Sequence, residues 1–521
     1  MSRRRKHWGW GYEDEAPSLS DVAGAAGLVE ARLGFAAQEP EAPVALGDAA
    51  LRAPRALPEP PAGVGWDVSD HARARHAWGS SYLDVVRGLR GRFDHAPDAV
   101  ARPADEHDVA AVLGWAGGAG VKVVPFGGGT SVVGGVTPAV DDPVVSLDLG
   151  RLDRVLEVDR VSRAARVQAG ALGPDLEAQL GEHGLTLRCF PQSFQLSTLG
   201  GWVATRAGGH FATGPTHIDD LVEAVRAVTP GAGTWASRRL PGSGAGPSPD
   251  RLLIGSEGTL GVITEAWVRV QPRPEHRASR GVRFERFELG LEAVRALAQS
   301  GLQPANCRLV DAAEAGFTGA GDGRSALLVL GFESTDAPVE ADLARGLELC
   351  AECGGSWDEP AGGGGSVGAW RDTFLQAPYL RDVLVQLGVL SETFETAITW
   401  DRVAQLHATV TEAVRDALAD DRALVTCRLT HAYADGAAPY FTVLAPARRG
   451  DEEAQWWAVK RAASDALLAG GATITHHHAV GRDHRPWYDQ QRPEPFAAAL
   501  RAAKAAVDPA GVLNPGVLID P

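Results

Sequence analysis

The chain has 521 residues, of which 45% are hydrophobic and 22% are charged, as in an ordinary folded protein. Its 66 acidic residues outnumber its 50 basic ones and give a net charge of -16, so nucleic-acid binding is not expected. The length predicts two or three lobes at ~150 residues per domain, and the lack of an uninterrupted apolar stretch of ~18 residues argues against a transmembrane helix.

The cysteines give no disulfide pattern. Cys189, Cys307, Cys350, Cys353 and Cys427 are odd in number and scattered, and no secretory signal precedes them. We therefore expect a reducing, cytoplasmic location. Cys350 and Cys353 have the spacing of a redox or metal pair, but no second pair of this kind accompanies them. Two thiols on one helix are the favoured interpretation.

Four segments follow one another along the chain. Residues 1–92 are expected to form a helical lead-in that covers the outside of the body. Residues 93–272 hold three glycine-rich loops. Residues 273–455 alternate strand-like and helical runs, which predicts a cap made of an antiparallel sheet with helices on one face; a glycine-rich connector at 359–370 is predicted to be a flexible loop near it. Residues 456–521 return to the second segment, and the whole predicts an α+β fold with two lobes.

The first glycine-rich loop is PFGGGTSVVGG, from Pro125 to Gly135. The apolar, β-branched run before it predicts a strand that enters a turn whose bare backbone amides can approach a diphosphate. The loop has neither the spacing of a Rossmann fingerprint nor the lysine of a Walker loop. An isolated glycine turn between strands is the alternative.

Two later segments have the same character. Residues 191–230 place small and hydroxyl residues before an apolar run, and residues 252–272 pass through three glycines into an alternating, strand-like pattern. Three such loops can line one long, flat ligand.

A histidine triplet, His476, His477 and His478, follows the strand-like TIT. On a strand, alternate side chains face opposite sides, so at most two of the three would enter one pocket. Adjacent histidines without nearby carboxylates lack the spacing of a zinc site, and the sequence assigns no metal. Hydrogen-bonded structural histidines are the alternative interpretation.

One tyrosine and two arginines are further candidates. Alternation places Tyr440 on the opposite strand face from Phe441, where a packing role would ordinarily be favoured. Arg381 and Arg308 would be solvated or salt-bridged side chains by spacing alone.

The segments PFGGGTS, QSFQLST, TRAG and EGTLGVI, in this order, resemble the PCMH-type FAD-binding domain of the vanillyl-alcohol oxidase superfamily. The ending VDPAGVLNPGVL is similar to the tail of that superfamily. Within it, the stretches RRRKHWGWGYED, SYLDVVRGLRG, YLRDVLVQLGVLSETFETAITWDRV and CRLTHAYADGAAPYFTV resemble the alkylglycerone-phosphate synthase (alkyldihydroxyacetonephosphate synthase) family. The resemblance covers nearly the whole chain.

The resemblance implies FAD as cofactor, bound non-covalently because the PFGGGTS loop has no Cys or His for attachment. The residues that it assigns to cofactor binding are Pro125, Phe126, Gly127, Gly128, Gly129, Thr130, Ser131, Gln192, Ser193, Ser197, Thr198, Thr205, Arg206, Ala207, Gly208, Glu257, Gly258, Thr259, Leu260, Gly261, Val262 and Ile263.

The resemblance also implies an activity. Enzymes of this family exchange the acyl chain of acyl-dihydroxyacetone phosphate for a fatty alcohol through an adduct at flavin N5, a step of ether lipid synthesis. When the family's roles are assigned to the matching residues of this chain, Tyr440 becomes the general base or acid and the histidine triplet lies at the reacting end of the substrate. Arg381 then binds the substrate phosphate, and Arg308 supports the substrate or the structure. A lipid-like substrate and no nucleic acid are expected as partners, and a homodimer and a peripheral membrane contact are compatible with the family.

Two departures leave the substrate open. Gln192 stands where the family tends to have an acid, and AVGRDHRPW follows the histidines in place of a lysine-containing stretch. One alternative is an FAD-dependent D-2-hydroxy acid dehydrogenase or oxidase, for lactate or glycolate, in which a histidine takes the hydroxyl proton. Another is a flavin-binding structural or regulatory protein without activity.

Overall fold

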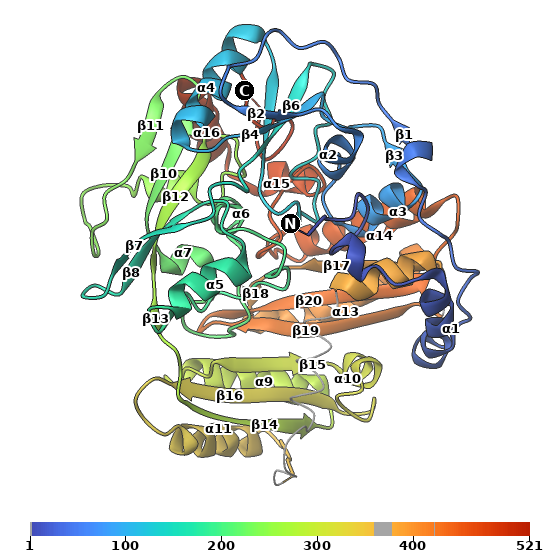
Figure 1. Cartoon of the computed structure of the whole chain (residues 1–521). Helices are drawn as coiled ribbons and strands as arrows, with labels where there is room; N and C mark the ends of the chain where they lie inside the picture. Colours follow the sequence, from blue (N-terminus) through green and yellow to red (C-terminus); the bar gives the residue numbers. More distant parts are fainter. Residues whose placement is uncertain (1–2, 359–377, 421, 521) are drawn as a thin grey trace.

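The computed structural model describes residues 3–358, 378–420 and 422–520 (Figure 1). The predicted connector at 359–370 lies outside these residues. The fold is α+β with a separate sheet-and-helix lobe, as the sequence predicts. Among the described residues no helix combines the length and apolar character needed to cross a membrane.

The region of the glycine-rich loops contains two sheets that share the upper part of Figure 1. In the first, β4, β6 and β5 are parallel and β2 is antiparallel to β4: β2 (Gly65–Asp67), β4 (Ala99–Arg102), β6 (Val144–Asp148), β5 (Lys122–Phe126). The second is antiparallel throughout, in the order β11 (Gly233–Ala236), β10 (Val222–Thr229), β12 (Val262–Arg269), β8 (Ala164–Gln168), β7 (Val155–Asp159).

Five helices and a small sheet complete the described part of this region. The helices are α4 (Glu106–Ala119), α5 (Gly173–Gly181), α6 (Leu199–Thr205), α7 (Ile218–Leu221) and α8 (Asp250–Leu253). A two-stranded sheet joins β9 (Leu185–Thr186) to β13 (Gln271–Pro272).

The seven-stranded antiparallel sheet forms the second half of the molecule. Its strands are β14 (His276–Phe284), β16 (Ala326–Ser334), β15 (Asn306–Val310), β19 (Leu424–Ala432), β20 (Gly436–Pro446) and β17 (Val389–Glu395), with β18 (Ile398–Thr399) beside β20. Its helices are α9 (Phe287–Gln299), α10 (Ala312–Thr318), α11 (Glu340–Glu352), α13 (Val403–Leu418), which follows the 3-10 turn η3 (Trp400–Arg402), and α14 (Glu452–Ala469).

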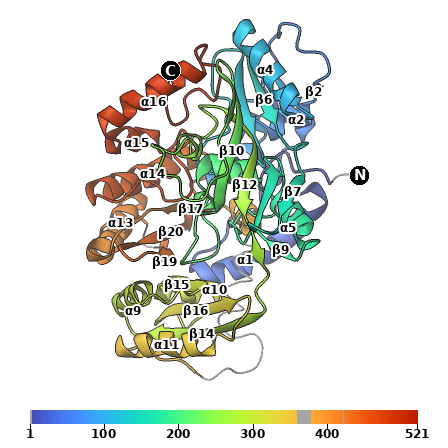
Figure 2. The same cartoon turned by 90° about the vertical axis from the view of Figure 1, so that its left-hand side faces the viewer.

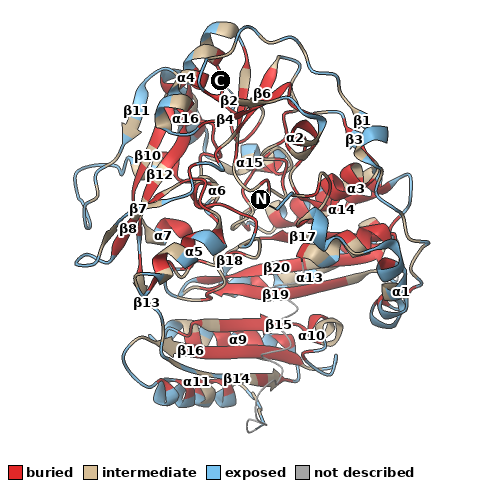
Figure 3. Ribbon diagram, viewed as in Figure 1, coloured by how far each residue is buried: buried red, intermediate tan, exposed pale blue. Residues whose placement is uncertain are grey.

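The two faces of this sheet differ in chemistry. Leu309 and Leu330 pack in one core with α9 and α11, and Phe441 and Val443 belong to the same core with α13 and α14. Burying each such side chain stabilises the fold by ~1.5–3 kcal/mol. The intervening residues point to the other face. There α10 packs against Val310 and Leu327, and α1 (Leu19–Leu33) packs against Leu444, so the prediction of helices on one face only was wrong, and the rest of this face is left for a ligand. Figure 3 shows the strands buried along most of their length.

The amino-terminal region does more than cover the outside, which corrects the sequence expectation. Lys6 is buried and forms an ion pair with Asp382, whose carboxylate also accepts from the Trp10 amide at 2.8 Å. Gly9 has φ +62°, and a Cβ there would lie 2.5 Å from the Asp382 carboxylate. A buried charge needs a partner, and this pairing draws residues 6–10 into the interior.

The remaining amino-terminal elements are helices and one strand pair. They are η1 (Glu13–Glu15), α1 (Leu19–Leu33), η2 (Leu46–Asp48), α2 (Asp70–Arg75), α3 (Tyr82–Leu89) and the pair β1 (Ala50–Leu51) with β3 (Arg92–Phe93). Capping boxes begin α1, at Ser18 and Asp21, and α3, at Ser81 and Asp84.

The carboxyl-terminal segment returns to the first region. After α15 (Arg485–Gln491) and α16 (Glu494–Val507), Leu513 forms a parallel bridge with Val123 of β5. Lys504 is buried and donates to the carbonyls of Thr259 and Leu513. In Figure 2 these helices lie on the opposite side of the molecule from the amino terminus.

Candidate active site

A cavity lies between the glycine-rich loops and the polar face of the seven-stranded sheet. Its volume is about 280 Å³ and it is partly open to solvent, which is near the lower end of the ~300–1000 Å³ of an ordinary small-molecule site. Its loop side is formed by Gly127, Gly128, Gly129, Thr130, Ser131, Gln192, Ser193, Ser197, Thr198, Thr205, Ala207 and Gly208. Its other side is formed by Arg308, Thr393, Arg428, His431, Tyr440, Thr442, Leu444, His477 and His478.

The first loop fits a diphosphate. Among the described residues, the backbone N–H groups of Gly128, Gly129, Thr130 and Ser131 donate to no protein acceptor. Such groups need a partner, and consecutive free amides form an anion-binding concavity. A Cβ at Gly128 would lie 1.8 Å from the Leu196 carbonyl oxygen, so the loop is pressed against the second loop as only glycine allows. These residues fit the diphosphate of FAD.

The second loop faces the same space, and the third does not. Ser197, Thr198 and Thr205 line the cavity, and Thr198 also caps α6. Glu257 is buried beside the cavity, where its carboxylate accepts from the amides of Val480 and Gly481 at 2.9 and 2.8 Å.

The structure therefore separates the predicted cofactor residues into two groups. Those outside the cavity lining are Pro125, Phe126, Arg206, Glu257, Gly258, Thr259, Leu260, Gly261, Val262 and Ile263. The third loop packs against the carboxyl-terminal segment outside this cavity lining, and the assignment of its residues to the cofactor stays a prediction.

Sheet register sets the other wall. Tyr440 pairs with Arg428 of β19 on one side and with Glu395 of β17 on the other. Directly opposed residues point to the same face, so the three form one row. Tyr440 lines the cavity and Phe441 lies in the core, which confirms their predicted opposite faces.

The next two rows become less polar. Thr442 stands between Thr426 and Thr393, and Leu444 lies two residues further along β20. Leu444 belongs to an apolar cluster with residues of α1. The cavity thus runs from a charged and aromatic end to an apolar end.

The histidine triplet is a bend and not a strand, which corrects the predicted approach. The buried Glu395 carboxylate accepts from the amides of His476, His477 and His478 at 2.5, 3.1 and 2.8 Å and from the Thr475 hydroxyl at 2.7 Å. Burial alone would raise the pKa of Glu395, but the histidines and these hydrogen bonds bring it below its ordinary value. One ionised carboxylate therefore fixes the bend.

Two histidines of the triplet reach the cavity. His477 and His478 line it, while His476 lies behind them and contacts the Tyr433 hydroxyl through Nε2 at 2.8 Å. The Nδ1 atoms of His476 and His477 are 3.0 Å apart. The prediction that at most two histidines enter one pocket is confirmed, although the strand argument for it was wrong.

The histidines are neutral near neutral pH. Burial lowers the pKa of His477 to about 3, and the charges of Arg428 and Arg308 act in the same direction. Burial likewise puts the pKa values of His431, His476 and His478 well below the ordinary value. These rings can each accept one hydrogen bond and donate another.

Three arginines face the cavity. Arg381 donates to the Ser80 carbonyl at 3.1 Å and to the Thr393 hydroxyl at 3.1 Å. Arg308 is buried and donates to the His210 carbonyl, and burial lowers its pKa to about 9, so it remains charged near neutral pH. Arg428 pairs with Glu314 at 2.7 Å, and its guanidinium lies 3.9 Å from the centre of the Tyr440 ring.

Several site residues escaped sequence reasoning. Trp10, His431 and Arg428 line the cavity, and Glu395 positions the triplet from behind. Their only signal was membership of stretches that resemble the synthase family, since nothing in their spacing marks them.

Comparisons with known proteins agree with this arrangement. The family model "FAD binding domain" matches residues 97–237, and "FAD linked oxidases, C-terminal domain" matches residues 273–518. An alkyldihydroxyacetonephosphate synthase of Caenorhabditis elegans is 32% identical over 494 residues, covering 87% of this chain and 81% of the relative. The alkyldihydroxyacetonephosphate synthase of Trypanosoma brucei brucei is 29% identical over 480 residues, covering 86% of this chain and 77% of the relative. A solved structure of an alkyldihydroxyacetonephosphate synthase is 25% identical, covers 98% of each chain and has a TM-score of 0.80.

Proposed function

The chain belongs to the alkyldihydroxyacetonephosphate synthase family of FAD enzymes, and from that premise we propose that it exchanges the acyl chain of acyl-dihydroxyacetone phosphate for a fatty alcohol. The single observation that carries this proposal is the cavity itself. It joins a loop that fits a diphosphate, a Tyr440 and histidine end, the side chain of Arg381 and an apolar end in one space.

The apolar end supports a long-chain substrate. Phe317, Leu380, Leu384 and Leu444 line the cavity, and Leu384 and Leu444 pack with residues of α1. A hydrocarbon chain gains ~0.8 kcal/mol for each CH₂ that it buries. A small hydroxy acid would leave this surface without a partner, so the dehydrogenase alternative is less supported.

The reaction replaces one oxygen substituent by another. The ester bond at the dihydroxyacetone carbon breaks, the fatty acid leaves, and the oxygen of the alcohol forms the ether, with no net oxidation. When bound, FAD supplies the reactive ring system at which this exchange takes place. We propose that it is held non-covalently by the free amides of the first loop.

Protein groups move the protons and hold the substrate. Among the described residues, the Tyr440 hydroxyl has no hydrogen-bond partner, so it is available to take and return the proton at the reacting carbon. His477 and His478, neutral and in the same wall, accept a hydrogen bond from the hydroxyl of the entering alcohol and donate one to the leaving carboxylate. Arg381 binds the phosphate through its planar fork.

Arg308 adds a buried positive charge to the cavity wall, close enough to act on His431 and His477. Its distance from solvent makes it a strong partner for an anionic group of the substrate. Three further expectations stay predictions: a cytoplasmic location, a homodimer and a peripheral membrane contact. The free state of all five cysteines supports the cytoplasmic location.

The decisive experiment mixes the purified FAD protein, without oxygen, with acyl-dihydroxyacetone phosphate and a fatty alcohol and identifies products by mass spectrometry. We expect an alkyl ether and one free fatty acid per turnover, with the flavin still oxidised at the end. Separate arms contain D-lactate or glycolate. Bleached flavin and a keto acid in those arms, with no ether in the first, would replace this proposal by the dehydrogenase.

A further inference from the structure

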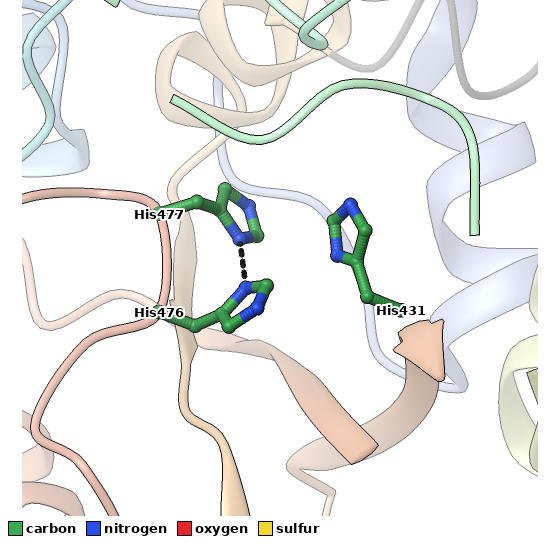
Figure 4. A group of neighbouring side chains, drawn as sticks. All are labelled: His431, His476 and His477. Carbon is green, nitrogen blue, oxygen red and sulfur yellow. Dashed lines mark hydrogen bonds between the residues drawn. The ribbon is translucent and has the colours of Figure 1, made fainter. Parts of the chain in front are cut away.

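Three histidines from two distant parts of the chain share one gap. His431 stands near the end of β19, and His476 and His477 come from the bend (Figure 4). One ring nitrogen of each lies within 4.8 Å of the other two, and the His476 and His477 Nδ1 atoms are already 3.0 Å apart. Three imidazoles around one point, with a cavity beside them, are the donor set of an open zinc site.

The surroundings hold the rings in the form that a metal needs. His431 Nε2 lies 3.1 Å from the Gly209 carbonyl oxygen, which can only accept, so Nε2 carries the proton and Nδ1 keeps its lone pair. A metal-binding histidine usually donates its other N–H to a carbonyl in this way. The Thr430 hydroxyl lies 3.1 Å from this Nδ1 and can turn its hydrogen to the Ala438 carbonyl when an ion binds.

His476 has an equivalent partner. Its Nε2 is 2.8 Å from the Tyr433 hydroxyl, which can accept from the ring and pass its own hydrogen to the Thr216 hydroxyl at 3.1 Å. With Nε2 protonated, His476 Nδ1 faces His477 Nδ1 with a lone pair. Without an ion, His477 Nδ1 donates its hydrogen to this lone pair. When His477 moves that hydrogen to Nε2, a cation between the two Nδ1 atoms satisfies both lone pairs.

We propose that His431, His476 and His477 bind a divalent ion of the zinc class, and that the bound ion blocks the exchange reaction. Zinc bonds of 2.0–2.1 Å place tetrahedral nitrogen ligands about 3.3 Å apart, so the wider pairs must move inward by side-chain rotation. The fourth position is left to the cavity, where His477 would otherwise face the substrate.

Binding is tested on the FAD protein by isothermal titration calorimetry with ZnCl₂ alone. We expect one ion per chain, with affinity at least tenfold weaker in His431→Gln and about tenfold weaker in Tyr433→Phe. His107→Gln, an exposed histidine on α4, is the control and should bind as the parent does. Flavin absorbance of each variant reports that the fold is retained. No binding, or equal affinity in His431→Gln, would overturn the proposal.

The inhibitory part rests on the proposed function and has its own measurement. Ether formation is followed against zinc concentration, and a chelator is then added. We expect full, reversible loss of turnover, with the half-inhibiting concentration raised about tenfold in Tyr433→Phe. Turnover that persists at saturating zinc would contradict the inhibition, while the calorimetric result would stand whether or not this chain makes ethers.

Discussion

The two walls of the cavity are built in opposite ways. The loop wall consists of consecutive residues that offer backbone amides, and it depends on atoms that are absent, since a Cβ at Gly128 would meet a carbonyl oxygen. The sheet wall consists of side chains from separate strands, and it depends on groups that are present, such as Tyr440 and Arg428. We therefore expect an added side-chain atom in the loop wall to prevent FAD binding. In the sheet wall, we expect the removal of a functional group to reduce turnover.

The largest effect is expected at the loop wall. In Gly128→Ala the new Cβ would lie 1.8 Å from the Leu196 carbonyl oxygen, which is backbone and cannot move aside without its loop. We expect the purified variant to carry no FAD and to show no turnover.

Gly118→Ala on α4 is the matched control. A Cβ at Gly118 meets nothing within 4 Å, and alanine in a helix stabilises by ~0.5–1 kcal/mol relative to glycine. This variant should keep its FAD and unfold at a slightly higher temperature. Normal flavin content in Gly128→Ala would show that the loop is not the diphosphate site.

At the sheet wall, Tyr440→Phe removes one hydroxyl and no packing. Positioned acid–base groups contribute ~10²–10⁴-fold to rate, so we expect a loss of that size in kcat with FAD content unchanged. Single-turnover ether formation and flavin absorbance measure the two quantities. Tyr82→Phe, a buried tyrosine of α3 outside the cavity, should retain full turnover. Equal turnover in both variants would remove Tyr440 from the chemistry.

The same contrast explains what the sequence could predict. The loop wall is local, so PFGGGTS identified a phosphate cradle from spacing and residue type alone. The alternation of strands and helices in the cap was also predicted, because the periodicity of each run is local. Glu395 and His431 lie beside the histidine triplet because of the strand register and the return of the chain to the sheet. Spacing in the sequence does not predict either contact. Tyr440 and Arg381 were assigned by family resemblance.

A smaller effect is expected at Arg381. Removing a charged hydrogen-bond donor costs ~1.5–3 kcal/mol, so Arg381→Ala should raise KM for acyl-dihydroxyacetone phosphate roughly 10- to 100-fold. The change in kcat should be smaller, since the phosphate is remote from the reacting carbon. Arg381→Lys should recover part of the loss, because it restores the charge without the fork. Arg461→Ala, exposed on α14, should change neither constant. A wild-type KM in Arg381→Ala would place the phosphate elsewhere.

The smallest expected effect is on the pH dependence of the unfolding free energy. It distinguishes the sheet wall, which contains a titrating histidine, from the loop wall, and it needs no substrate. The pKa of His477 is about 3 in the folded chain because the ring is buried, against an ordinary value of 6.5. Between these values the unfolded chain binds a proton that the folded chain does not, so stability is complete above pH 6.5 and falls as the pH is lowered toward 3. Each pH unit in that window costs up to ~1.4 kcal/mol for this one group.

His477→Gln should therefore flatten the decline in unfolding free energy between pH 7 and pH 5.5, measured by urea denaturation, while His107→Gln leaves its slope as in the parent. This range lies above the titration of Glu395, whose folded pKa is below the ordinary 4.5 and whose stabilising effect is lost only at lower pH. The loop wall has no such dependence, because backbone amides do not titrate. An unchanged slope in His477→Gln would mean that the ring takes up its proton in the folded chain, and the neutral histidines of the proposed mechanism would have to be abandoned.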